Sequence, residues 1–174
     1  YVRRLQPEPG SRAARERTRR GRWFTIGSEL NPFASFTPGL FDGKTALVTG
    51  GTRAIGAAIA QALVEAEHQV IVTGTSPNGS GPEGCDYLPC DFSNLSEVHA
   101  LGEEIAGREI SILVNNAGTR NVASVEEFDP EGFLRLQQVN VTEPFFLCRA
   151  AIPGMRKRRF GRILNLTSGF SVVS

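Results

Sequence analysis

The chain has 174 residues, of which 40% are hydrophobic and 21% charged, and its formal net charge is +1. This is the composition of an ordinary globular domain, and no apolar run approaches the roughly 20 residues that cross a bilayer, so we expect no membrane-spanning segment. The three cysteines show no C-x-x-C spacing. They predict neither a disulfide framework nor a metal site, and they favour a reducing, cytoplasmic compartment.

The small net charge conceals a basic N-terminal segment. Residues 1–40 hold eight Arg and three Glu among Pro, Gly and Ser, a composition that cannot bury enough apolar surface to fold. We therefore expect a disordered extension before a globular body at 41–174. A nucleic-acid-binding arm would interleave aromatic residues, which are scarce before Trp23, and an organellar transit peptide would contain fewer acids. A solvated extension is the favoured interpretation, with targeting as the alternative and no nucleic-acid partner.

In the body, strand-like and helix-like segments alternate. Short apolar runs predict strands at 45–49, 70–73, 87–90, 110–114 and 162–167. The alternation predicts an α/β fold with a doubly wound, Rossmann-like parallel sheet. Only seven residues follow the fifth strand, whereas the common order has six strands, so we expect a sheet truncated at its C-terminal side.

Four segments between these strands have their own signals. Ile55, Ile59, Leu63 and Ala66 share one face of a helix, whereas the Pro- and Gly-rich residues 76–84 predict a loop where a helix is usual. Capping boxes at Asn94 with Glu97 and at Ser124 with Glu127 predict two helix starts.

The longer segment that follows, 130–157, predicts a long helix. Val141, Phe145, Cys148, Ile152 and Met155 recur at alternating spacings of four and three, which indicates a core-facing stripe. Pro144 removes a backbone hydrogen bond and should loosen the helix near Asn140.

The stretch Thr49–Gly56 joins the first strand to the first helix. Its glycines allow backbone N–H groups to approach a ligand closely, and the helix that follows presents unpaired N–H groups and the positive end of its dipole. These properties predict a site for a phosphate or pyrophosphate.

Every predicted strand ends in residues suited to a ligand site. The carboxyl ends of parallel strands meet at one edge of the sheet, where ligands bind. The segments are 50–56, 73–75, 91–92, 115–118 and 167–169.

Together these residues resemble the short-chain dehydrogenase/reductase family. The family's T-G-x-x-x-G-x-G motif corresponds to Thr49–Gly56, with Ala54 in place of the middle glycine, and its N-N-A-G motif is intact at Asn115–Gly118. The resemblance implies a bound NAD(P) and a carbonyl or secondary-alcohol substrate. We expect a helix-start position to tolerate Ala54 better than a position with positive φ would.

The resemblance also implies individual roles. Asp91 would hydrogen-bond the adenine amino group with Phe92 against the ring, Asn140 would position a water of the proton relay, and Ser168 would hydrogen-bond the substrate oxygen as a catalytic residue. The full set of implied cofactor-binding residues is Gly50, Thr52, Arg53, Ile55, Gly56, Thr75, Asp91, Phe92, Asn116, Ala117 and Gly118.

One departure concerns proton transfer. In the family a Y-x-x-x-K pair on the next helix supplies the general acid/base, but no Tyr or Lys follows Ser168 in this sequence. We therefore expect a truncated or partial oxidoreductase chain. The alternative is a catalytically inactive nucleotide-binding or interaction module. Family members pair through the helix that corresponds to 130–157, which implies a homo-oligomer.

Charge favours NADP over NAD as cofactor. NAD sites place an acid after the second strand to hold the ribose 2′-hydroxyl, whereas a nearby Arg accommodates a 2′-phosphate. Here no acid follows Thr73 until Glu83, and Arg53 lies in the phosphate loop itself.

Overall fold

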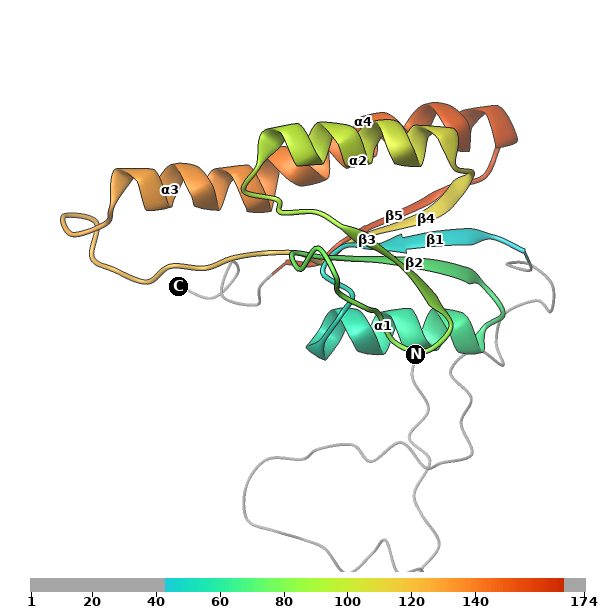
Figure 1. Ribbon diagram of the computed structural model, residues 1–174. Coiled ribbons are helices and arrows are strands. Elements are labelled where there is room, and N and C mark those ends of the chain that lie inside the picture. The colour runs from blue at the N-terminus through green and yellow to red at the C-terminus, as the bar shows by residue number, and fades with distance from the viewer. Residues whose placement is uncertain (1–42, 168–174) are drawn as a thin grey trace, which may run out of the picture. The chain divides into compact units, whose positions relative to one another are not determined.

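A computed structural model describes residues 43–167, and within them a five-stranded parallel sheet forms the centre (Figure 1). The strands lie in the order β3-β2-β1-β4-β5. Strand order reverses between β1 and β4, as in a doubly wound fold, so the predicted fold class is confirmed. The strands are β1 (Thr45–Val48), β2 (Gln69–Gly74), β3 (Cys85–Pro89), β4 (Ile110–Asn115) and β5 (Arg162–Asn165).

Helices cover both faces of the sheet. In Figure 1, α1 (Ala54–Glu65) lies on one side, and α2 (Leu95–Gly107) and α4 (Glu143–Arg158) lie side by side on the other. Successive strand residues point to opposite faces, so Ala46 and Val48 pack with the α1 layer and Leu47 packs with the α2–α4 layer. The sheet is therefore buried between two apolar layers, and its carboxyl edge stays available.

The first helix begins with an exposed apolar residue. Its packed face consists of Gly56, Ala60 and the partly buried Ile59 and Leu63, whereas Ile55 is 65% exposed. Ile55 belongs to the first turn of the helix. Ile55 therefore does not share the burial of Ile59 and Leu63, and it is available to a ligand, as its expected cofactor-binding role requires.

Between β2 and β3 the described chain forms a loop and no helix, as predicted. The start of α2 is also as predicted: Asn94 Oδ1 accepts a hydrogen bond from the N–H of Ser96 at 3.1 Å. Glu97 reaches back to this cap, accepting from Asn94 Nδ2 at 2.9 Å and from the N–H of Asp91 at 2.7 Å. One acid thus ties the loop after β3 to the helix.

The capping box at Ser124 and Glu127 was a wrong prediction. Residues 125–127 form a turn, closed by the N–H of Glu127 on the carbonyl of Ser124 at 3.2 Å. The helix α3 (Pro130–Gln137) begins later, where Asp129 caps the N–H of Gly132 at 2.8 Å. Asp followed by Pro at the first helical position is a stronger start, because Pro has no N–H to leave unpaired there.

The long helical stretch is interrupted, as Pro144 predicted. A single π-helical turn, η2 (Gln138–Thr142), separates α3 from α4, and Pro144 lies in the first turn of α4. Pro144 cannot donate to the carbonyl of Asn140 four residues earlier, so the wider turn replaces a regular one.

The predicted core stripe of this stretch was right at Met155, which is buried, and at Cys148, which packs against the core, but wrong at its other three positions. Val141, Phe145 and Ile152 are 57%, 61% and 37% exposed. The buried row has a spacing of four and consists of Val139, Glu143, Leu147, Ala151 and Met155. A hydrophobicity pattern misses this row because it contains a glutamate, and contact with α2 and β4 decides which face is buried.

Candidate functional site

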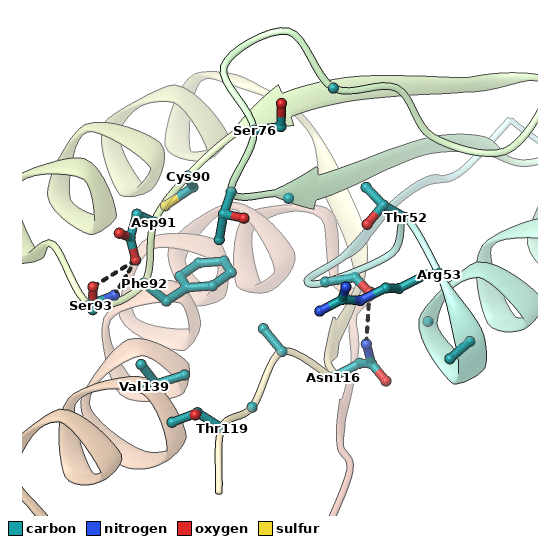
Figure 2. A pocket seen from close by; sticks show the side chains of 18 of the residues that line it. Thr52, Arg53, Ser76, Cys90, Asp91, Phe92, Ser93, Asn116, Thr119 and Val139 are labelled. Carbon is teal, nitrogen blue, oxygen red and sulfur yellow. Dashed lines mark hydrogen bonds between the residues drawn. The ribbon is translucent and has the colours of Figure 1, made fainter. Parts of the chain in front are cut away.

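A pocket of about 710 Å³ opens at the carboxyl edge of the sheet. Its walls come from the loop after β1, the loop after β2, the segment after β3 and the N-N-A-G segment after β4 (Figure 2). All eleven residues that the sequence analysis assigned to the cofactor line this pocket: Gly50, Thr52, Arg53, Ile55, Gly56, Thr75, Asp91, Phe92, Asn116, Ala117 and Gly118.

The glycines of the first loop are required by close packing. Gly50 has φ +61°, and a Cβ there would lie 3.1 Å from the Cα of Ala117. A Cβ on Gly56 would meet the carbonyl of Gly50 and lie 2.5 Å from Asn116 Nδ2. Only residues without a side chain allow the turn to close against the helix start, and the first-turn residues Ala54, Ile55 and Gly56 line the pocket. This cradle fits a pyrophosphate.

Thr49 and Asn116 fix this loop to the sheet. The buried Thr49 Oγ1 accepts hydrogen bonds from the N–H groups of Asn116 at 3.0 Å and Ala117 at 2.9 Å. Asn116 Nδ2 donates to the carbonyls of Thr49 at 2.8 Å and Gly50 at 3.1 Å. Sequence reasoning gave Thr49 no role, although its place at the head of the glycine motif was a signal.

Ala54 is strained. Its φ is +49°, in the left-handed region, so the expectation that this helix-start position readily tolerates alanine was wrong. Any residue with a side chain costs roughly 1–2 kcal/mol of folding free energy in that region. The methyl group at this position is therefore a local defect in the cradle.

Arg53 precedes α1 and lines the same pocket. Figure 2 shows its side chain extending over the cavity. Within residues 43–167 the only ion pair joins Glu104 to Arg108, so no described carboxylate neutralises Arg53. The first turn of α1 has no acidic residue, which leaves this end of the pocket positive.

Asp91 and Phe92 lie at the opposite end of the pocket (Figure 2). Asp91 Oδ1 accepts from Ser93 Oγ at 2.7 Å and from the N–H of Ser93 at 2.9 Å, and these bonds lower the pKa of the Asp91 carboxyl. Both bonds use Oδ1, so Oδ2 keeps its capacity to accept from a ligand. Beside them, burial raises the pKa of the Cys90 thiol to about 12, which makes it unreactive.

Asn140 holds the loop that follows the N-N-A-G segment. Its Oδ1 accepts from the N–H of Thr119 at 2.9 Å, and its Nδ2 donates to the carbonyl of Thr119 at 2.8 Å. Both polar groups of the side chain are thus committed to the backbone. Ser168, the other predicted catalytic residue, lies outside the described residues.

The pocket also contains residues that sequence reasoning missed. Ser76, Ser80 and Tyr87 come from the β2–β3 loop and from β3, and Arg135 and Val139 come from successive turns of α3 and η2. Two signals in the sequence were available: Arg135 and Val139 are four residues apart, and the loop is rich in hydroxyl groups.

The described residues contain no group of three or more His, Cys, Asp or Glu placed to hold a metal ion. No helix in residues 43–167 is long and apolar enough to cross a membrane.

Comparison with known proteins gives consistent relatives. The chain is 35% identical over 149 residues to D-beta-hydroxybutyrate dehydrogenase of Cupriavidus necator, covering 78% of this chain and 57% of that protein. It is 36% identical over 131 residues to the 3-oxoacyl-[acyl-carrier-protein] reductase MabA of Mycobacterium avium, covering 74% and 50%. The chain thus spans about half the length of the curated relatives it matches.

Solved structures share the fold. A short-chain dehydrogenase from Streptomyces avermitilis matches with a TM-score of 0.69 and 29% identity over 76% of this chain and 52% of that one. A metagenomic short-chain oxidoreductase in complex with NADP matches with a TM-score of 0.65 and 28% identity over 74% and 62%. The family model of short chain dehydrogenase matches residues 44–174, and the chain therefore belongs to the short-chain dehydrogenase family.

Proposed function

We propose that this chain binds NADP(H) and that its family chemistry is hydride transfer between NADP(H) and a carbonyl or secondary alcohol. The glycine cradle at Gly50 and Gly56 suits the pyrophosphate, and Asp91 and Phe92 suit the adenine. The relatives named above are a dehydrogenase and a reductase, which supports a small-molecule substrate.

The observation that carries the choice of NADP is the position of Arg53. Its guanidinium has no carboxylate partner among the described residues and lies over the pocket. Thr75 and Ser76, which follow β2, add hydroxyls where NAD-binding proteins place an acid. A phosphate at this position would gain charge-assisted hydrogen bonds, whereas a free ribose hydroxyl would gain little.

Binding measurements on the full chain test this proposal. NADPH should bind at least about tenfold more tightly than NADH, and Arg53→Ala should remove that difference, because a hydrogen bond to a charged group contributes roughly 1.5–3 kcal/mol. Arg149→Ala, an exposed arginine of α4 outside the pocket, is the matched control and should change neither affinity. Equal affinities for the two cofactors in the unmodified chain would refute the NADP preference.

Catalysis is proposed through Ser168 and Asn140, acting with a Tyr and a Lys that have no counterpart after Ser168 in this sequence. The competing function is a nucleotide-binding or interaction module without catalysis. Stopped-flow assays of NADPH oxidation with a panel of ketones separate the two. Tight NADPH binding without oxidation would support the module, and turnover would support the enzyme.

We further propose that copies of the chain associate through α3 and α4. Phe133, Val141 and Phe145 are each more than half exposed along this stretch. Such an apolar surface is unfavourable in water unless it is covered. Light scattering should give the mass of a dimer or larger assembly, and Phe145→Glu should lower it to that of one chain.

The free Cys85, Cys90 and Cys148 fit the reducing cytoplasm proposed as the location.

A further inference from the structure

The loop between β2 and β3 lies directly against the sheet and the first helix. A Cβ on Gly81 would collide with the side chain of Val72, and a Cβ on Gly84, which has φ +81°, would lie 3.0 Å from Val64 Cγ1. Val72 belongs to the apolar layer that α1 covers. The loop therefore occupies a position close to the sheet that a helix with side chains would not fit.

Tyr87 of β3 holds the first half of this loop. Its Oη donates a hydrogen bond to the carbonyl of Ser76 at 2.5 Å, and the N–H of Gly79 donates to the same carbonyl at 3.2 Å. The tyrosine ring lies against Gly79, where an added Cβ would be 2.6 Å from the ring carbon Cζ. The turn Ser76–Gly79 is thus tied to β3 by one side chain.

This turn forms part of the pocket wall. Thr75, Ser76 and Ser80 line the cavity together with Arg53 and Thr52, which come from the loop after β1 (Figure 2). Between Thr73 and Pro82 the chain contains no acidic residue. A guanidinium with nearby hydroxyl donors and no carboxylate is suited to an anion, and a fixed arrangement of donors binds more tightly than one that must be ordered.

We propose that Tyr87 is a positioning residue for cofactor selectivity. By tying the Ser76–Gly79 turn to β3, it keeps the Thr75 and Ser80 hydroxyls in the wall of the pocket that Arg53 also lines, where the 2′-phosphate of NADP(H) would bind. This proposal rests on the NADP(H) function proposed above. It adds that discrimination between NADPH and NADH depends on the bond from Tyr87 to Ser76 as well as on Arg53.

Tyr87→Phe is the primary test, because it removes only the hydroxyl and keeps the ring against Gly79. In the full chain the Kd for NADPH should rise about tenfold, the effect of losing ordered hydrogen bonds to a charged group. The Kd for NADH should change less than about twofold. Amide hydrogen exchange in residues 75–84 should accelerate in the same variant.

Thr75→Val provides the matched comparison. This substitution removes a hydroxyl that lines the pocket and leaves the Tyr87–Ser76 bond in place. It should weaken NADPH binding selectively without faster amide exchange in the loop. Gly79→Ala, which displaces the tyrosine ring, should reproduce both effects of Tyr87→Phe. Gly107→Ala, where no atom lies within 4 Å of the added Cβ, should produce neither effect.

The outcomes distinguish the positioning role of Tyr87 from the proposed NADP(H) function on which it rests. If the unmodified chain prefers NADPH and Tyr87→Phe weakens NADPH and NADH equally, or weakens neither, the positioning role is overturned and the proposed function stands. If the unmodified chain shows no preference for NADPH, both proposals fail. A selective loss for NADPH that accompanies faster loop exchange supports the proposal.

Discussion

The hydroxyl oxygen of Thr49 accepts a hydrogen bond from the backbone N–H of Asn116 at 3.0 Å, and Nδ2 of Asn116 donates a hydrogen bond to the carbonyl of Thr49 at 2.8 Å. This reciprocal pair joins the loops that follow β1 and β4, on either side of the point where strand order reverses. The pocket opens at that point, so its shape depends on the pair.

Thr49→Val should therefore lower stability by about 2–4 kcal/mol, because two partly buried N–H groups, those of Asn116 and Ala117, lose their acceptor. Urea denaturation of both chains measures the difference. Thr49→Ser keeps the oxygen and should retain most of the stability. A loss below about 0.5 kcal/mol in the valine variant would show that the two N–H groups find other partners.

Ala54→Gly should stabilise the protein by about 1 kcal/mol and raise Tm by a few degrees, because glycine adopts positive φ without strain. Ala58→Gly, an exposed position inside the same helix, is the matched control. There glycine should destabilise by about 1 kcal/mol. Two shifts of the same sign would contradict the strain at Ala54.

Glu143 should make stability fall as pH rises. Its carboxylate is fully buried, neither oxygen has a hydrogen-bond partner among the described residues, and burial raises its pKa from 4.5 to about 8. The folded state therefore holds a proton that the unfolded state releases above pH 4.5. The stabilising contribution is fully present below that pH and is lost progressively towards pH 8, at up to about 1.4 kcal/mol per pH unit.

Two neutral variants measure this contribution. The side chains introduced by Glu143→Gln and Glu143→Leu cannot ionise. The unfolding free energy of either variant should therefore rise relative to that of the unmodified chain between pH 5 and pH 8. Denaturant titrations at several pH values give that difference. A difference that is constant across this range would mean that Glu143 has an ordinary pKa in the folded protein.

Asn140→Ala should release the loop after β4. The variant loses both hydrogen bonds to the backbone of Thr119, so stability should fall by about 1–2 kcal/mol, with faster amide exchange around residues 117–121. Asn140→Asp keeps the acceptor oxygen, loses the donor and should give an intermediate effect. Unchanged exchange in the alanine variant would show that the loop is held by other contacts.

Local sequence chemistry was sufficient for much of the fold. Strand-length apolar runs, the Asn94 cap and the loop-forming Pro and Gly residues of 76–84 were interpreted correctly, because each signal acts within a few residues of the chain. The meeting of the cofactor segments in one pocket also followed, since parallel strands bring their carboxyl ends to one edge.

The sequence by itself determined the parallel doubly wound sheet, the glycine cradle and the family, because these depend on strand periodicity and on short motifs with fixed geometry. Tertiary structure decided which row of η2 and α4 is buried, since contacts with α2 and β4 select Glu143 and Leu147 over Val141 and Phe145. It also decided the positive φ of Ala54 and the bond from Tyr87 to Ser76. These features depend on partners that lie far apart along the chain or on the closure of a turn over the sheet, and residue type and spacing do not specify such contacts.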